Sequence, residues 1–195
     1  EEMWANITYF LKAVIPEGLP EKLLNHFFLE MYCRRWSQAP VRAVLAQIPT
    51  IMMWDDHDIF DGWGSYPPER QECDVFQEVF QQALRVFDIF QLRCSNRNRL
   101  SAGVAHRSLR LTFRDYCILA LDNRSERKID QIMSISHWND VKTFLAGIAG
   151  KTVPNLLVMT GVPAVYRKQA LWYASLAGVN KATVVVVIND HDYRE

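Results

Sequence analysis

Three short apolar runs in this 195-residue chain are each followed at once by a cluster of polar residues. The runs cover residues 48–53, 116–121 and 183–188, and the clusters cover residues 55–58, 122–127 and 189–192. Short apolar runs that contain β-branched residues and are bounded by turn-forming residues predict buried strands. In α/β proteins, ligands and catalytic groups gather at the carboxyl ends of strands. If the three strands are neighbours, the clusters converge on one rim of a sheet.

Helical spacing of apolar residues alternates with these runs. Helices are predicted at residues 4–14, 20–32, 37–46, 74–92, 137–149 and 167–176. Residues 106–121 predict a hairpin of two strands with its turn at Arg114-Asp115, and residues 155–159 predict another buried strand. A hairpin beside strands that alternate with helices predicts an α/β fold with a mixed sheet of the α+β kind.

The composition limits the classes of partner. Lys plus Arg and Asp plus Glu number 22 each, so charge gives no argument for nucleic acid or for an anionic membrane surface. No apolar window of about 18 residues predicts a transmembrane helix, and no basic region followed by an apolar core predicts a signal peptide. These observations favour a cytoplasmic location. The sequence does not determine the oligomeric state.

The first cluster has the residue types best suited to catalysis or metal binding: Asp55, Asp56, His57 and Asp58. Adjacent carboxylates repel each other, so crowding them is destabilising unless a cation lies nearby. Carboxylate oxygen and imidazole nitrogen are ligands of divalent and trivalent metals. The cluster therefore predicts a metal site or a histidine general acid held by carboxylates. The alternative is that these residues cap a helix or are simply solvated in a loop.

The second cluster, residues 122–127, contains Arg124 and Arg127. Arginine presents a planar fork of donors that binds phosphate or carboxylate. For Arg124, anion recognition and a structural Arg–Glu network both stay open. For Arg127, the structural network is favoured. The third cluster, residues 189–192, predicts no function by itself because terminal residues are often frayed.

Four segments share residue types, order and spacing with one known family. They are Trp36-Ser37-Gln38, Met53–Ser65 (MWDDHDIFDGWGS), Leu121–Arg127 (LDNRSER) and Gly161–Tyr166 (GVPAVY). The second segment is long and unusual, and the resemblance covers roughly residues 30–170. On these segments the chain resembles the PhoD-like phosphatases, or alkaline phosphatase D, of the calcineurin-like metallophosphoesterase superfamily.

The resemblance implies a four-layer α-β-β-α sandwich that hydrolyses phosphate monoesters or diesters, with small-molecule phosphoesters as substrates. It implies divalent or trivalent metal ions in a dinuclear site, with Fe, Ca, Mn and Zn as the choices. By position in the motif, Asp56 is a metal ligand with Asp55 beside it, and His57 is the catalytic histidine. Asp58 is the acidic neighbour that orients His57 and raises its pKa. Arg124 is expected to bind the substrate phosphate.

The chain departs from the family's pattern in its other metal ligands. The family's Asp-bearing first strand and bridging Gly-Asp segment do not occur before residue 55, and the later Gly-Asp-x-His segment is not recognisable. One Asp and one His do not hold two metals. We therefore expect residues 1–195 to be a single PhoD-like domain, incomplete at both ends, from the interior of a longer enzyme. The alternative is a non-catalytic relative that keeps the fold as a binding or regulatory module.

Overall fold

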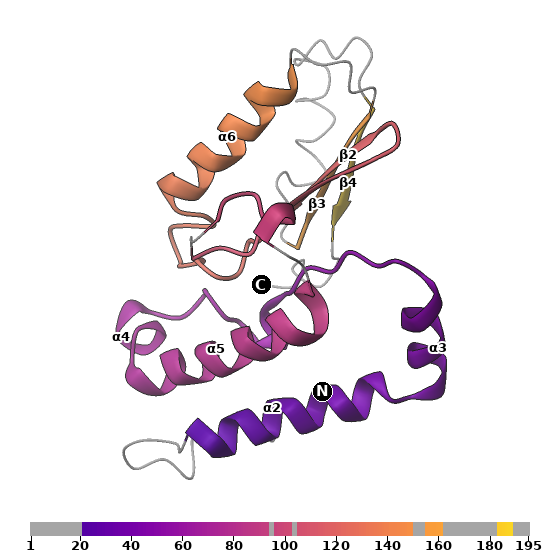
Figure 1. Cartoon of the computed structure of the whole chain (residues 1–195). Helices are drawn as coiled ribbons and strands as arrows, with labels where there is room; N and C mark the ends of the chain where they lie inside the picture. The colour runs from indigo at the N-terminus through magenta and orange to yellow at the C-terminus, as the bar shows by residue number, and fades with distance from the viewer. Residues whose placement is uncertain (1–20, 94–95, 103–104, 150–154, 162–182, 189–195) are drawn as a thin grey trace. The chain divides into compact units, whose positions relative to one another are not determined.

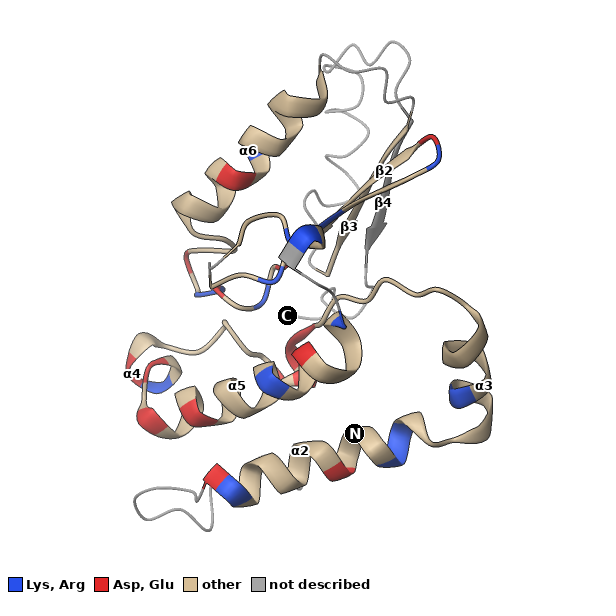
Figure 2. Cartoon of the chain, in the orientation of Figure 1, with Lys and Arg blue, Asp and Glu red and all other residues tan. Residues whose placement is uncertain are grey.

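The computed structural model describes residues 21–93, 96–102, 105–149, 155–161 and 183–188 (Figure 1). The chain divides into two compact units. The first unit contains Glu1–Arg93 and Arg127–Asp130, and the second contains Cys94–Glu126 and Gln131–Glu195. Basic and acidic side chains are interspersed along the described elements (Figure 2), in keeping with a formal net charge of zero.

Helices make up the first unit. They are α2 (Glu21–Trp36), α3 (Ala39–Gln47), the 3-10 turn η1 (Asp56–Asp58), α4 (Pro68–Gln71), α5 (Asp74–Phe87) and the π-helical turn η2 (Asp88–Leu92). Leu24, Phe28 and Tyr32 of α2 are buried, and their spacing of four residues places them on one face of the helix. Most of the buried side chains of α5 are also apolar. The predicted helices at residues 20–32, 37–46 and 74–92 are confirmed, with small shifts at their ends.

The predicted buried strand at residues 48–53 is wrong. This segment has no regular secondary structure, and burial begins only at Trp54. The Ile48 side chain is 56% exposed. An apolar run becomes a strand only where a neighbouring strand accepts and donates its backbone hydrogen bonds, and Pro49 has no N–H to donate. The acidic turn therefore follows an irregular segment and not a strand end.

The second unit carries a mixed sheet and helix α6 (Ile135–Ala149). The sheet has the strand order β1-β2-β3-β4. Strand β1 (Leu109–Phe113) runs antiparallel to β2 (Tyr116–Leu121), whereas β2 pairs in parallel with β3 (Asn155–Thr160) and β3 in parallel with β4 (Thr183–Ile188). Arg114 makes the tight turn between β1 and β2 with a left-handed φ of 52°. The predicted hairpin, the mixed sheet and the strands at residues 155–159 and 183–188 are confirmed.

Helix α6 lies in the chain between β2 and β3 and covers the sheet with its apolar face (Figure 1). Its buried Val141 packs with Leu119 of β2 and with Leu100. Apolar side chains that are partly buried extend this cluster: Leu121, Phe144, Leu145 and Leu156. This core packs α6 against β2, the strand that leads into the loop 122–126. The predicted helix at residues 137–149 is confirmed.

Some expectations fall outside the described residues. The predicted helices at residues 4–14 and 167–176 and the polar cluster at residues 189–192 are among them. The described residues contribute one sheet, so the α/β class is established and the second sheet of a four-layer sandwich stays an expectation. Among the described residues, no helix has the length and the apolar character needed to cross a bilayer.

Candidate functional site

The acidic turn, residues Asp55–Asp58, is built by its own side chains. Asp55 is the N-cap of η1, and its Oδ1 accepts a hydrogen bond of 2.7 Å from the backbone N–H of His57. In return, Oδ2 of Asp58 accepts a hydrogen bond of 3.1 Å from the backbone N–H of Asp55. The Asp55 side chain also accepts a hydrogen bond from the backbone N–H of Asp58, so the turn is a capping box, in which the first and fourth residues satisfy each other's backbone donors. The local sequence Asp-x-x-Asp therefore fixes the shape of the turn.

Two tryptophans on either side of the turn anchor it to α5. The Trp54 ring stacks on Phe87 with ring centroids 4.7 Å apart, and Trp63 stacks on Phe80 at 5.0 Å. Both indole rings are only 2% exposed. Burial of large aromatic rings is a strong apolar contribution to stability. The turn thus rests on a rigid aromatic base.

Two glycines let the chain close behind the acidic turn. The backbone N–H of Gly62 donates a hydrogen bond of 3.0 Å to Oδ2 of Asp56, at a φ of 74°. Gly64 has a φ of 91°, and a Cβ atom there would lie 2.5 Å from Cγ of Arg127. Only glycine combines a positive φ with such a close approach without strain. One oxygen of Asp56 is thereby held by the backbone of the loop.

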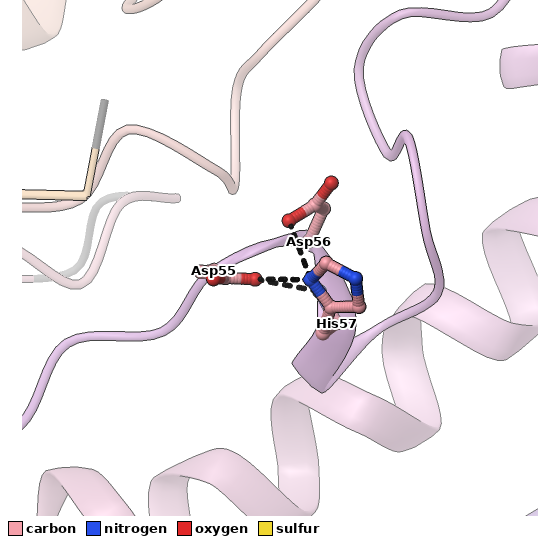
Figure 3. Close-up of side chains that lie close together, drawn as sticks. All are labelled: Asp55, Asp56 and His57. Atoms are coloured by element: carbon pink, nitrogen blue, oxygen red, sulfur yellow. Dashed lines mark hydrogen bonds and ion pairs between the residues drawn. The ribbon is translucent and has the colours of Figure 1, made fainter. Parts of the chain in front are cut away.

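Three ligand-type side chains meet at the turn (Figure 3). Nδ1 of His57 lies 3.2 Å from Oδ1 of Asp55 and 3.2 Å from Oδ1 of Asp56. One ligand atom from each residue can be chosen so that all lie within 4.8 Å of one another. The side chains are 18%, 8% and 40% exposed for Asp55, Asp56 and His57 respectively. Two carboxylates and an imidazole, with only the imidazole well exposed, are a donor set suited to a divalent cation.

The carboxylates and the imidazole change each other's protonation. Burial, together with the neighbouring Asp56, raises the pKa of Asp55 to about 6. Burial lowers the pKa of His57, but the charges of Asp56 and Asp55 raise it by more, so the net pKa lies above its ordinary value. Burial acts in opposite directions on the two groups, but the crowded negative charges act in one direction on both: they favour a bound proton or another cation. The donor set therefore fits a metal ion, and the protonated imidazole is the alternative cation.

Asp58 has different contacts from its neighbours. Its Oδ1 accepts a hydrogen bond of 2.7 Å from the Tyr32 hydroxyl and one of 2.6 Å from Nε2 of Gln91. Burial raises the pKa of Asp58, and the hydrogen bonds from Tyr32, the Asp55 amide and Gln91 oppose that rise. Helical spacing placed Tyr32 on an apolar face, and its burial is confirmed. The contact between Tyr32 and Asp58 spans 26 residues of sequence and had no local signal.

Arg124 lies in the second unit and is 2% exposed. Its backbone N–H donates a hydrogen bond of 3.0 Å to Oδ1 of Asp122. Asp122 also holds the backbone of Ser125, and Thr160 donates a hydrogen bond of 2.6 Å to Asn123. The loop 122–126 is therefore a buried polar structure. The acidic turn belongs to the first unit, so the convergence of the two clusters stays a prediction.

The family model of PhoD-related phosphatases matches residues 18–189. An uncharacterized protein of Saccharomyces cerevisiae is 30% identical over an alignment of 148 residues that covers 63% of this chain and 21% of that protein. The chain thus spans about a fifth of the length of this curated relative. No solved structure is significantly similar to the chain. Because the family match covers most of the sequence, including the polar clusters at residues 55–58 and 122–127, the chain belongs to the family of PhoD-related phosphatases.

Proposed function

We propose that this chain is part of a metal-dependent hydrolase of phosphate monoesters or diesters. One observation carries the proposal: in a PhoD-related chain, the Asp55 and Asp56 carboxylates crowd one imidazole at a half-exposed turn. This arrangement stores charge repulsion that a cation would relieve. Family membership supports phosphate ester chemistry, and the donor set supports the metal.

Asp55 and Asp56 are the proposed metal ligands. A bound divalent cation would polarise the phosphoryl group and lower the pKa of a water molecule. Asp56 keeps one oxygen on the Gly62 amide and directs the other, Oδ1, toward the shared space beside His57. Asp55 and Asp56 offer two carboxylates to one cation, so a dinuclear site needs further ligands from outside the acidic turn. The donor chemistry is compatible with Mn, Zn, Fe and Ca.

His57 is the proposed general acid. Burial lowers the pKa of His57, but the charges of Asp56 and Asp55 raise it above its ordinary value, which favours the protonated imidazole. Its Nε2 lies 3.5 Å from Oδ1 of the exposed Asp61, on the side away from the two ligands. A proton on Nε2 is in position for transfer to the departing alcohol oxygen of a phosphoester. Asp58 supports this role through the turn, and Arg124 is the proposed partner of the substrate phosphate.

A non-catalytic binding module is the second candidate function. It is favoured by the contacts of Nδ1 of His57, because a protonated imidazole between Asp55 and Asp56 neutralises the turn without a metal. In that case the acidic turn would be a structural element of a phosphatase-like fold. The two candidates differ in whether the chain binds a metal.

Metal binding and ester hydrolysis together test the proposal. We expect the chain to bind Mn²⁺ in calorimetry and, with that metal, to hydrolyse p-nitrophenyl phosphate or its bis ester. Asp56→Ala should abolish both properties, since it removes a ligand. His57→Ala should keep the metal and lower kcat by roughly 10²–10⁴-fold, the usual effect of losing a general acid.

The control is the exposed pair of His26 and Glu30, which lie 3.7 Å apart on α2. His26→Ala should leave metal binding and hydrolysis unchanged. Loss of metal binding in His57→Ala would make His57 a ligand instead of an acid. A chain that neither binds Mn²⁺ nor hydrolyses either ester would support the binding module.

A further inference from the structure

Asp58 closes a ring of three hydrogen bonds with two side chains distant in sequence. The Tyr32 hydroxyl donates to Oδ1 of Asp58 at 2.7 Å, and Nε2 of Gln91 donates to the same oxygen at 2.6 Å. Gln91 also donates to the Tyr32 oxygen at 2.7 Å. The donors and acceptors match when Asp58 is ionised and Tyr32 is protonated. Burial and the Asp58 charge raise the pKa of Tyr32, which keeps its hydroxyl a donor.

The backbone that presents Gln91 is unusual. Residues Asp88–Leu92 form a π-helical turn at the end of α5, and Arg93 ends it with a left-handed φ of 41°. A π-turn makes i→i+5 hydrogen bonds, is rare and is frequently found at functional sites. Here the π-turn carries the side chain that reaches Asp58.

Aromatic packing fixes Tyr32, the other side chain that donates a hydrogen bond to Asp58. The Tyr32 ring lies 5.3 Å from Phe90 and 6.2 Å from Trp36, and Trp36 lies 5.8 Å from Phe90. Tyr32 is 4% exposed, so its ring has little freedom to turn away. The hydroxyl is therefore delivered to Asp58 at a fixed place by α2 and η2 together.

The hydrogen-bonded ring of Tyr32, Gln91 and Asp58 is connected to the candidate metal ligands through the Asp58 carboxylate. Oδ2 of Asp58 holds the backbone N–H of Asp55 at 3.1 Å, and Oδ1 of Asp55 holds the N–H of His57 at 2.7 Å. The same Asp55 oxygen lies 3.2 Å from Nδ1 of His57. A change in the direction of Asp58 would move Asp55 and, through it, the donor set.

We propose that Tyr32 and Gln91 are positioning residues of the metal site, which act through Asp58 and the backbone of Asp55. The proposal rests on the function proposed above. In this proposal, Asp58 holds the backbone of the acidic turn in place and does not contact the substrate. Loss of a side chain that holds a metal ligand in place weakens metal affinity by roughly 10–100-fold. We expect an effect of that size although neither residue touches the metal.

Two conservative variants of the full chain test the proposal. Tyr32→Phe removes one hydroxyl and keeps the ring, and Gln91→Leu removes the amide and keeps the approximate size. Each should weaken Mn²⁺ binding in calorimetry roughly tenfold and speed hydrogen exchange of the Asp55 amide. Because both donors serve one oxygen, the double variant should weaken binding by less than the product of the two single effects.

Phe28→Leu is the matched control. Phe28 lies one helical turn before Tyr32 on the same buried face of α2, so its truncation loosens the helix without removing a polar contact. The variant should keep the Mn²⁺ affinity of the unaltered chain within about twofold. That is well below the roughly tenfold loss expected for a positioning residue. Thermal unfolding of all variants would show whether the losses of affinity follow stability.

Each outcome separates the two claims. If the unaltered chain binds Mn²⁺ and Asp56→Ala does not, but Tyr32→Phe and Gln91→Leu bind as the unaltered chain does, the positioning claim is overturned and the metal site stands. If Phe28→Leu weakens binding as much as Tyr32→Phe, the effect is one of general stability and the positioning claim is again overturned. If the unaltered chain binds no Mn²⁺, the proposed function fails and the positioning claim fails with it.

Discussion

The acidic turn at residues 55–58 and the loop at residues 122–126 are both polar clusters, but their charges are satisfied in different ways. In the turn, Asp55 and Asp56 crowd one another and share an imidazole that is 40% exposed. In the loop, the carboxylate of Asp122 accepts hydrogen bonds from the backbone of residues on both sides, including Arg107 at 2.6 Å. A carboxylate surrounded by donors needs no further cation, whereas crowded carboxylates do.

The loop is also tied to α6 by a buried chain of contacts. His137 is 0% exposed, and its Nδ1 lies 3.0 Å from Oε2 of Glu126. Its Nε2 lies 2.7 Å from Oγ of Ser108, and the Ser108 hydroxyl accepts a hydrogen bond of 2.8 Å from the Asp122 amide. Serine, histidine and glutamate thus stand in the order of a catalytic relay, yet Ser108 is 1% exposed. The Ser108 hydroxyl also holds the Asp122 amide, so we assign this network the structural role of holding the loop.

Matched substitutions at Asp122 and Asp55 should differ most in their effect on the free energy of unfolding. Asp122→Asn replaces one carboxylate oxygen, which accepts hydrogen bonds, with an NH₂ group, which donates them. The groups around it include two donors, the backbone N–H groups of Arg107 and Arg124. We expect the free energy of unfolding in urea to fall by about 3 kcal/mol, because buried donors lose their acceptor. Asp55→Asn keeps a good N-cap and removes a repelling charge, so stability should change by no more than about 0.5 kcal/mol. Equal losses at both sites would remove the distinction between the two clusters.

Ser108→Ala separates a structural network from a hidden relay. Removing the hydroxyl leaves the Asp122 amide without that acceptor, and we expect a loss of about 1–2 kcal/mol in the free energy of unfolding. Hydrolysis of p-nitrophenyl phosphate should be unchanged per folded molecule. A fluorophosphonate probe should not label the unaltered chain at Ser108, and labelling there would contradict the structural assignment.

The pH dependence of stability gives the smallest expected effect. Burial, together with the neighbouring His106, lowers the pKa of His137 from 6.5, while Glu126 and Asp122 oppose that shift. The unfolded chain therefore binds more protons than the folded chain just below pH 6.5. The contribution of His137 should be complete above that pH and should be lost as the pH falls below it.

The difference in unfolding free energy between the unaltered chain and His137→Gln, measured from pH 7.5 to 5, would isolate this contribution from that of the carboxylates. The C2 proton of His137 in NMR gives a direct check that does not depend on the folding of the variant. The midpoint of its titration should lie below the ordinary pKa of histidine. Titration at or above that pKa would contradict the prediction.

Local sequence determined much of this protein. The helices α2 and α5 follow from apolar spacing, the hairpin from alternation, and the acidic turn from Asp55 and Asp58 three positions apart. The segment MWDDHDIFDGWGS also pointed to the PhoD family, which the family match bears out. These features depend on residues within a few positions of one another, so the sequence displays them directly.

Only the tertiary structure decided which apolar runs pair and which polar groups meet. Residues 48–53 have the composition of a strand, but they pair with no strand in the described part of the chain and stay irregular. Asp58 meets Tyr32 and Gln91 across 26 and 33 positions of sequence. Strand pairing and buried hydrogen bonds require two partners to be brought together by the packing of other elements. That requirement is a property of the folded chain, and no short stretch of sequence contains it.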